Sequence, residues 1–232
     1  MKKVDIGIIG AMRPEVEKII EMLEQKACTS ISGIDFYCGK LYGKSVAVAQ
    51  CGIGKVFAAI CTEAMILNFA PSLVVNTGVG GALSPTLRPL DIVIATKLVQ
   101  HDMDTSPIGD PVGLISGINK IYFDTDARAV EILLSAAAEI GANASLGTIA
   151  TGDKFVSSLE DKERIRESFF ADACEMEGGA VAHVAFVNSV PFAVLRAISD
   201  SADGKAEMDY PAFLSAASDL STRLTLELIK KY

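Results

Sequence analysis

Short apolar runs alternate with stretches of helical spacing along most of this chain. The run VDIGIIG at residues 4–10 has no polar alternation, which is typical of a strand buried on both faces. The stretch that follows places its apolar residues on one side of a helix, which we predict over 15–26. Strands of this kind need helices on both sides of their sheet. We therefore predict an α/β fold, with one three-layer α/β/α domain over residues 1–232 and a central mixed sheet.

The other predicted elements follow the same alternation. We expect strands over 72–78, 90–100, 144–153 and 191–199, helices over 56–69, 125–141, 178–189 and 210–232, and a hairpin over 34–52. Only the segment 101–120 departs from this pattern, because it is interrupted by glycine and proline and has no periodicity. Irregular segments of this length are usually functional or interfacial, and a tolerated surface insertion is the alternative.

Composition restricts the possible partners and chemistry. The net charge of −8 argues against nucleic acid or an anionic membrane as the main partner, and no apolar stretch is long enough to span a membrane. The five cysteines form no CxxC pair, which favours reduced thiols in the cytoplasm over disulfides or zinc. With only two histidines, we expect no metal site, and acid–base chemistry must depend on aspartate and glutamate.

Four predicted strands end in turns that carry glycine or an acid. They are GIIGAMRPEV (7–16), VVNTGVGGAL (74–83), ATGDKFV (150–156) and AISD (197–200). Ligands of α/β proteins bind outside the carboxyl ends of strands, so these turns are expected to converge on one pocket. We interpret the glycines of 77–83 as a turn that lets backbone approach a ligand, or as an ordinary turn. The similar segment CGIGKV (51–56) lacks the phosphate-loop pattern, and we interpret it as a tight turn that opens a helix.

The acids at these turns are candidate catalytic and binding groups. Glu15 follows Pro14 at a predicted helix start, where it is either a base aimed into the pocket or a charge that complements the helix dipole. Glu175 and Glu177 flank Met176, and two carboxylates beside a soft apolar side chain suit the hydroxyls and face of a ribose. The alternative for this segment is a solvated turn.

Asp200 ends the apolar run VPFAVLRAISD, where alternation places it on the same face as Arg196. The two residues are about 13 Å apart along an extended strand, so Arg196 is expected to hold another acid, such as Glu177. Burial at the strand end would favour the protonated form of Asp200 and make it a usable acid. The alternative is that Asp200 caps the next helix.

Taken together and in this order, the motifs GIIGAMRPEV, GIGK, NTGVGGAL, TGDKFV, EMEGGAVAHV and VLRAISD closely resemble the bacterial 5′-methylthioadenosine/S-adenosylhomocysteine nucleosidases. These enzymes belong to the purine nucleoside phosphorylase-like superfamily, and the resemblance runs along essentially the whole chain. It implies an α/β/α domain, a homodimer, no cofactor and a role in methionine salvage. It also implies hydrolysis of the N-glycosidic bond of methylthioadenosine or adenosylhomocysteine, which releases adenine.

The resemblance also assigns roles to residues. Glu15 matches the base that activates water, Asp200 matches the acid that protonates the purine, and Glu177 matches a ribose ligand. The other matched positions are Met176 at the ribose, Gly81, Phe155 and Val156 at the adenine, Met12 and Tyr210 near the ribose and the 5′ substituent, and segment 101–120 at the partner subunit's 5′ pocket. The chain departs from the family at Val79, where a serine is common, and at Ile108, where an aromatic residue often closes the 5′ pocket.

Three other functions remain open. A phosphorylase of the same superfamily needs cations around its phosphate, and the first turn offers Glu15 instead, although Arg13 could turn inward. A nucleosidase for another 5′-substituted adenosine, such as 5′-deoxyadenosine or aminodeoxyfutalosine, would share the mechanism. A nucleoside-binding protein without catalysis is the third, and it is disfavoured because the chain keeps Glu15, Glu177 and Asp200.

Overall fold

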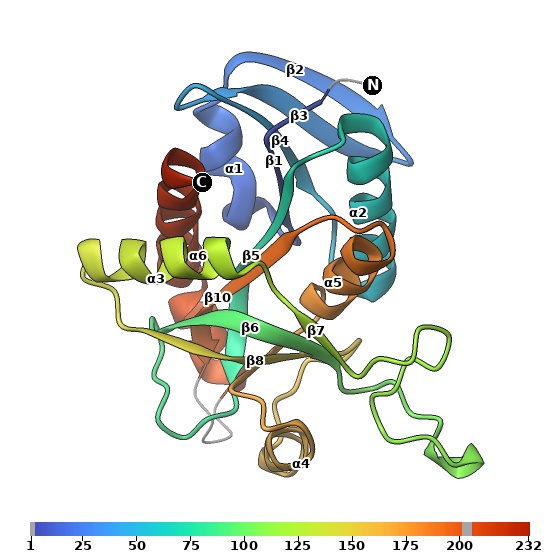
Figure 1. The fold of residues 1–232 in the computed structure, drawn as a ribbon. Helices are drawn as coiled ribbons and strands as arrows, with labels where there is room; N and C mark the ends of the chain where they lie inside the picture. Colours follow the sequence, from blue (N-terminus) through green and yellow to red (C-terminus); the bar gives the residue numbers. More distant parts are fainter. Residues whose placement is uncertain (1–2, 201–205) are drawn as a thin grey trace.

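The computed structural model describes residues 3–200 and 206–232. In this part of the chain, ten strands form one mixed sheet (Figure 1). The strands are β1 (Ile6–Gly10), β2 (Glu24–Ile31), β3 (Ile34–Leu41), β4 (Lys44–Gln50), β5 (Leu73–Ala82), β6 (Ile92–Gln100), β7 (Tyr122–Asp124), β8 (Ala144–Thr151), β9 (Ala173–Glu175) and β10 (Phe192–Asp200). The helices are α1 (Arg13–Glu21), α2 (Lys55–Phe69), the short 3-10 helix η1 (Ser106–Ile108), α3 (Ala127–Glu139), α4 (Leu159–Phe169), α5 (Gly178–Val187) and α6 (Ala206–Lys231).

The sheet partly closes on itself. Its strand order is β10-β6-β8-β9-β5-β1-β4-β3-β2, with β7 on β6, and β10 pairs with β5 as well as with β6. The strands β5, β10, β6, β8 and β9 therefore form a ring of pairings, while β1 to β4 extend it on one side. This curvature brings the carboxyl ends of β5, β8, β9 and β10 close together.

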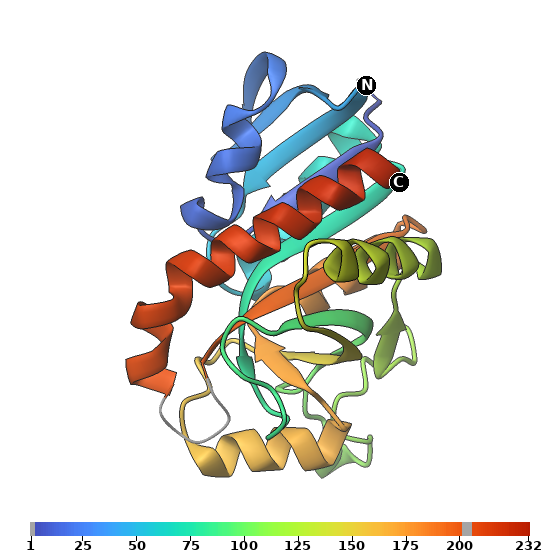
Figure 2. The ribbon, with the colours of Figure 1, turned by 90° about the vertical axis from the view of Figure 1, so that its left-hand side faces the viewer.

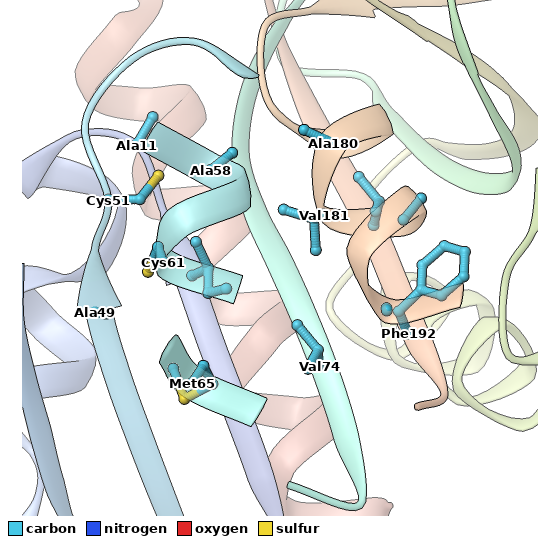
Figure 3. Packing of buried hydrophobic residues seen from close by; sticks show 14 of the residues in the cluster. Ala11, Ala49, Cys51, Ala58, Cys61, Met65, Val74, Ala180, Val181 and Phe192 are labelled. Atoms are coloured by element: carbon cyan, nitrogen blue, oxygen red, sulfur yellow. The ribbon is translucent and has the colours of Figure 1, made fainter. Parts of the chain in front are cut away.

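Helices cover both faces of the sheet, as predicted. The helices α1, α3 and α6 pack on one face, along which α6 runs for most of its length (Figure 2), while α2 and α5 pack on the other. Each face has its own apolar core. Figure 3 shows side chains of α2 and α5, including Met65 and Val181, gathered beside Val74 of β5. Within the described part of the chain, no helix combines the length and apolar character needed to cross a membrane.

Two predicted elements differ from the structure. The helix predicted over 15–26 ends at Glu21, because residues 24–31 form the edge strand β2 and pair with β3. The backbone hydrogen bonds of this pairing outweigh the weak helical spacing of Glu24–Lys26. The glycine-rich segment 77–83 is not a turn, since β5 continues through it to Ala82 and pairs with β10 and β9.

The irregular segment 101–120 is a loop that extends away from the sheet (Figure 1). Its regular structure is limited to η1 and to an isolated bridge between Ile115 and Lys120. Ile108 at the end of η1 is 83% exposed, so this chain alone does not cover its side chain.

Candidate active site

The carboxyl ends of the strands meet at one cavity, as predicted. All ten residues that the sequence singled out line its wall: Met12, Glu15, Gly81, Phe155, Val156, Glu175, Met176, Glu177, Asp200 and Tyr210. They lie at or just after the ends of β1, β5, β8, β9 and β10, at the start of α1, and in α6. Lining residues that the sequence analysis did not select include Ile53, Cys174 and Ser199.

Glu15 is the third residue of α1, and its side chain turns back into the cavity. One carboxylate oxygen accepts the backbone N–H of Met12 at 2.8 Å, and the other accepts the N–H of Val79 at 3.1 Å. The side chain is buried, and this burial raises the pKa of Glu15, although Arg196 and the backbone N–H groups oppose the change. Glu15 is therefore a weakly solvated carboxylate in a fixed orientation, rather than an exposed helix-start acid.

The glycines of β5 make room for this carboxylate. A Cβ atom at Gly78 would lie 2.5 Å from Glu15 Oε1, and one at Gly81 would lie 2.8 Å from Asp200 Oδ2. Both contacts are closer than real Cβ atoms allow, so the strand can pass the two acids only without side chains at these positions. The glycines of 77–83 suggested a turn. At positions 78 and 81 they instead let a strand pass close to two acids.

Arg196 of β10 lies behind the cavity and is fully buried. Its main carboxylate partner is Glu175, to which Nη2 donates, while the distance from Nη2 to Glu177 Oε2 is 3.9 Å. The expectation that Arg196 holds Glu177 is thus only partly right. The oxygens of Glu175 also accept the Thr151 hydroxyl and the backbone N–H groups of Glu177 and Gly178. Glu175 therefore has its hydrogen-bonding capacity occupied by protein groups.

Glu177 lies at the start of α5, and one of its oxygens accepts the backbone N–H of Gly54 at 2.8 Å. Its other oxygen is at 3.9 Å from Arg196, which is longer than a hydrogen bond. Burial, with a smaller contribution from the charge of Glu175, raises the pKa of Glu177 to about 7. The Arg196 guanidinium and the Gly54 N–H act in the opposite direction.

Asp200 ends β10 and is buried. Lys162 of α4 donates to its Oδ2 at 3.0 Å, and the Ser199 hydroxyl donates to its Oδ1 at 3.0 Å. Asp200 is separate from Arg196, as predicted, but its contact with Lys162 was not expected, because Lys162 lies 38 residues away in a helix that was not predicted. The pairing of β10 with β5 shifts register between Ile198 and Asp200, so simple alternation does not hold at the strand end.

Aromatic and sulfur-containing side chains form another part of the wall. The rings of Phe155 and Tyr210 meet edge to face with centroids 5.5 Å apart, and the Tyr210 hydroxyl lies 3.3 Å from Met12 Sδ. Phe155 is 45% exposed, so this side of the cavity is its mouth. A flat apolar ligand could bind between these groups and the buried acids.

Comparisons with known proteins identify the family. A model of the phosphorylase superfamily matches residues 5–230. The chain belongs to the phosphorylase superfamily. The 5′-methylthioadenosine/S-adenosylhomocysteine nucleosidase of Shewanella halifaxensis is 38% identical over 97% of this chain and 99% of the relative. The aminodeoxyfutalosine nucleosidase of Campylobacter jejuni is 37% identical over 97% of this chain and 98% of the relative.

A solved structure agrees with these relatives. The Neisseria meningitidis 5′-methylthioadenosine/S-adenosylhomocysteine nucleosidase in complex with methylthio-immucillin-A has a TM-score of 0.94 and is 36% identical, covering 98% of this chain and 99% of its own. The resemblance read from the motifs is thereby confirmed.

Proposed function

We propose that this chain, as one domain over residues 1–232, hydrolyses the N-glycosidic bond of 5′-methylthioadenosine and S-adenosylhomocysteine. The observation that carries the proposal is the meeting of three buried carboxylates, Glu15, Glu177 and Asp200, in the wall of one cavity. The relatives that are named nucleosidases support the same reaction. The products are adenine and either 5-methylthioribose or S-ribosylhomocysteine.

Glu15 and Asp200 divide the proton transfers of this reaction. When the bond from C1′ to the purine nitrogen breaks, its electron pair goes to the leaving base. With substrate bound, Asp200 is protonated, and its carboxyl group donates this proton to N7 of the purine, which neutralises the developing negative charge. A water oxygen bonds to C1′, and Glu15 accepts a proton from that water. The Glu15 carboxylate also stabilises the positive charge that develops on the sugar.

The remaining residues of the cavity orient the substrate. Glu177 and Met176 hold the ribose, and Gly81, Phe155 and Val156 line the adenine site. Met12 and Tyr210 contact the sugar and the 5′ substituent. For Glu175 we propose a different role from the sugar ligand suggested by its sequence position, because its oxygens already bind Arg196, Thr151 and backbone N–H groups. Glu175 instead fixes the turn that presents Met176 and Glu177.

The charges around the cavity favour water over phosphate as the nucleophile. Arg13, which could have supplied a phosphate site, is 74% exposed and forms an ion pair with Glu17 on the surface of α1. Among the described residues that line the cavity, the only cation is Lys154, and its ammonium binds Asp161 outside. Glu15, near the start of α1, turns into the cavity and would repel a phosphate. We therefore favour a hydrolase over a phosphorylase.

We also propose that two copies of the chain associate through α2. This helix exposes the apolar side chains of Val56, Phe57 and Ile60, beside Ile53 in the turn before it. A contiguous apolar surface of this kind marks an interaction site. In a dimer, segment 101–120 of one subunit would reach the 5′ end of the partner's cavity and cover Ile108.

The five free thiols support a cytoplasmic location, and the products fit a role in methionine salvage.

A second candidate substrate is aminodeoxyfutalosine. It is favoured by the relative of that name at 37% identity, and by Ile108, which leaves more room than an aromatic residue at the proposed 5′ end. The purine and ribose contacts would be the same for both substrates. Only the 5′ substituent distinguishes them.

Adenine release from a panel of 5′-substituted adenosines tests the proposal. We expect release from methylthioadenosine and adenosylhomocysteine in phosphate-free buffer, with rates that do not rise when phosphate is added. A requirement for phosphate would identify a phosphorylase, and preferential release from aminodeoxyfutalosine would identify the second candidate. Wild-type turnover in both Glu15→Gln and Asp200→Asn would overturn the mechanism, since each variant removes one of the two proposed proton transfers.

A further inference from the structure

The segment CGIGKV does more than open a helix, because the first N–H groups of α2 bind carboxylates from two distant loops. The N–H of Gly54 donates to Glu177 Oε1 at 2.8 Å, and the N–H of Lys55 donates to Asp153 Oδ1 at 2.7 Å. The helix has no cap from its own Gly54, so these two acids serve as its cap. The positive end of the helix dipole favours both of them.

The side chain of Lys55 closes a ring of contacts around this turn. Its Nζ lies 2.7 Å from Asp102 Oδ1, and Asp102 Oδ2 accepts the backbone N–H of Asp153 at 2.9 Å. Lys55, Asp102 and Asp153 thereby connect the loops that follow β4, β6 and β8. Although partial burial opposes it, the hydrogen bond from Lys55 and that from the Asp153 backbone lower the pKa of Asp102, which stays ionised.

The backbone at Gly54 fits closely against this ring. Gly54 has a φ of 101°, which a residue with a side chain rarely adopts, and a Cβ atom there would lie 3.0 Å from Asp153 Oδ1. The three charged residues do not line the cavity. Their connection to it runs through the Gly54 N–H, which is bound to one oxygen of Glu177.

We propose that Lys55, Asp102 and Asp153 are positioning residues that set the orientation of Glu177 toward the ribose hydroxyls. They hold in place the Gly54 N–H, which donates to Oε1 of Glu177, and this leaves Oε2 to accept hydrogen bonds from the sugar. The inference rests on the proposed role of Glu177 as a ribose ligand. A misplacement of about 1 Å at such a group can cost about 100-fold in rate.

The test compares two substrates in each variant. One is methylthioadenosine, and the other is its analogue lacking both ribose hydroxyls, which gives Glu177 nothing to bind. For Lys55→Met, we expect kcat/KM for methylthioadenosine to fall by at least about 10-fold, while kcat/KM for the dideoxy analogue changes much less. Lys55→Arg should recover most of the loss, because it keeps a cation near Asp102. Lys231→Met removes an exposed ion pair with Glu139 and is the matched control.

The outcomes separate this inference from the function on which it depends. Equal losses for both substrates, or no loss for either, would overturn the positioning role. Glu177→Gln must itself reduce the preference for the hydroxyl-bearing substrate, and if it does not, the proposed role of Glu177 fails instead. Asp153→Asn weakens the same ring of contacts at the loop after β8. If Lys55→Met does not fold, the two substrates are compared in this variant instead.

Discussion

The ammonium group of Lys162 lies 3.0 Å from Asp200 Oδ2, and both side chains are almost completely buried. Lysine is rarely buried to this extent unless it is paired. The contact joins α4, which packs on β8, to the end of β10, so it fixes the position of the proposed acid relative to the loop that carries Phe155 and Val156. In the proposed reaction, the contact also places a positive charge beside the carboxylate that Asp200 becomes after it gives up its proton.

Replacement of Lys162 should destabilise the protein in a way that depends on Asp200. We expect Lys162→Met to reduce the free energy of unfolding of the substrate-free protein by about 3–5 kcal/mol, because it leaves the buried Asp200 carboxylate without this ammonium group. Adding Asp200→Asn should recover part of the loss, since the carboxylate charge is then absent. Urea unfolding of both single variants and the double variant gives the coupling energy.

The control for this cycle is Lys18→Met, which breaks an exposed ion pair with Asp219 and should cost less than about 1 kcal/mol. Strictly additive effects of Lys162→Met and Asp200→Asn would contradict the coupling.

The candidate site could be predicted from the sequence because its residues come from strand ends. A buried strand that stops at an acid, as at Asp200, or at a turn before an acid, as at Glu15, places that acid at a known edge of the sheet. This reasoning needs only local sequence. It does not reveal how each acid is paired, since the partners are supplied by elements that are far apart in the chain.

The burial of Lys162 and the edge strand β2 could not be predicted from the sequence. The helix that carries Lys162 is amphipathic but mostly charged, and its charged residues suggest a solvated face. Only the tertiary structure shows that Lys162 is turned inward. Likewise, β2 is exposed along its length and has no apolar face to identify it, so its pairing with β3 is not visible in its own residues.

Gly78→Ala should impair catalysis through Glu15. The new methyl group would lie 2.5 Å from Glu15 Oε1, and because β5 is paired with β10 at this residue, we expect the carboxylate to move. We expect kcat to fall by at least about 100-fold, the scale of losing a well-placed base. Gly43→Ala, in the turn between β3 and β4, is the control: a Cβ atom there meets no other atom, and although a φ of 79° costs stability, adenine release should remain at the wild-type rate. Equal rates in both variants would show that Glu15 tolerates displacement.

The exposed apolar face of α2 should hold two subunits together. Val56 is 69% exposed, so Val56→Asp should leave the fold of each subunit intact while disrupting the proposed interface. Light scattering after size-exclusion chromatography is expected to show dimers for the wild type and monomers for the variant. Adenine release should fall with the dimer, because segment 101–120 could no longer complete the partner's pocket. Leu134→Asp, on the opposite face of the sheet, is the control, and it should remain dimeric.

The stability of the protein should depend on pH through Glu177. Its pKa is about 7 in the folded protein and 4.5 in the unfolded chain, so between these values the folded state binds more protons. The contribution of Glu177 to the free energy of unfolding is therefore fully present below pH 4.5, and it is lost as the pH rises through 7. In Glu177→Gln the titration is absent, while the amide oxygen can still accept the Gly54 N–H.

Urea unfolding at pH 4.5, 6 and 8 should reveal this contribution as a difference between the variant and the wild type. We expect Glu177→Gln to gain stability relative to the wild type as the pH rises, by up to about 3 kcal/mol, since each tenfold change in proton affinity corresponds to about 1.4 kcal/mol. Glu167→Gln replaces a 74% exposed carboxylate, and its pH curve should run parallel to that of the wild type. A Glu177→Gln curve that is also parallel would mean that the Arg196 guanidinium and the Gly54 N–H compensate fully for the burial of Glu177.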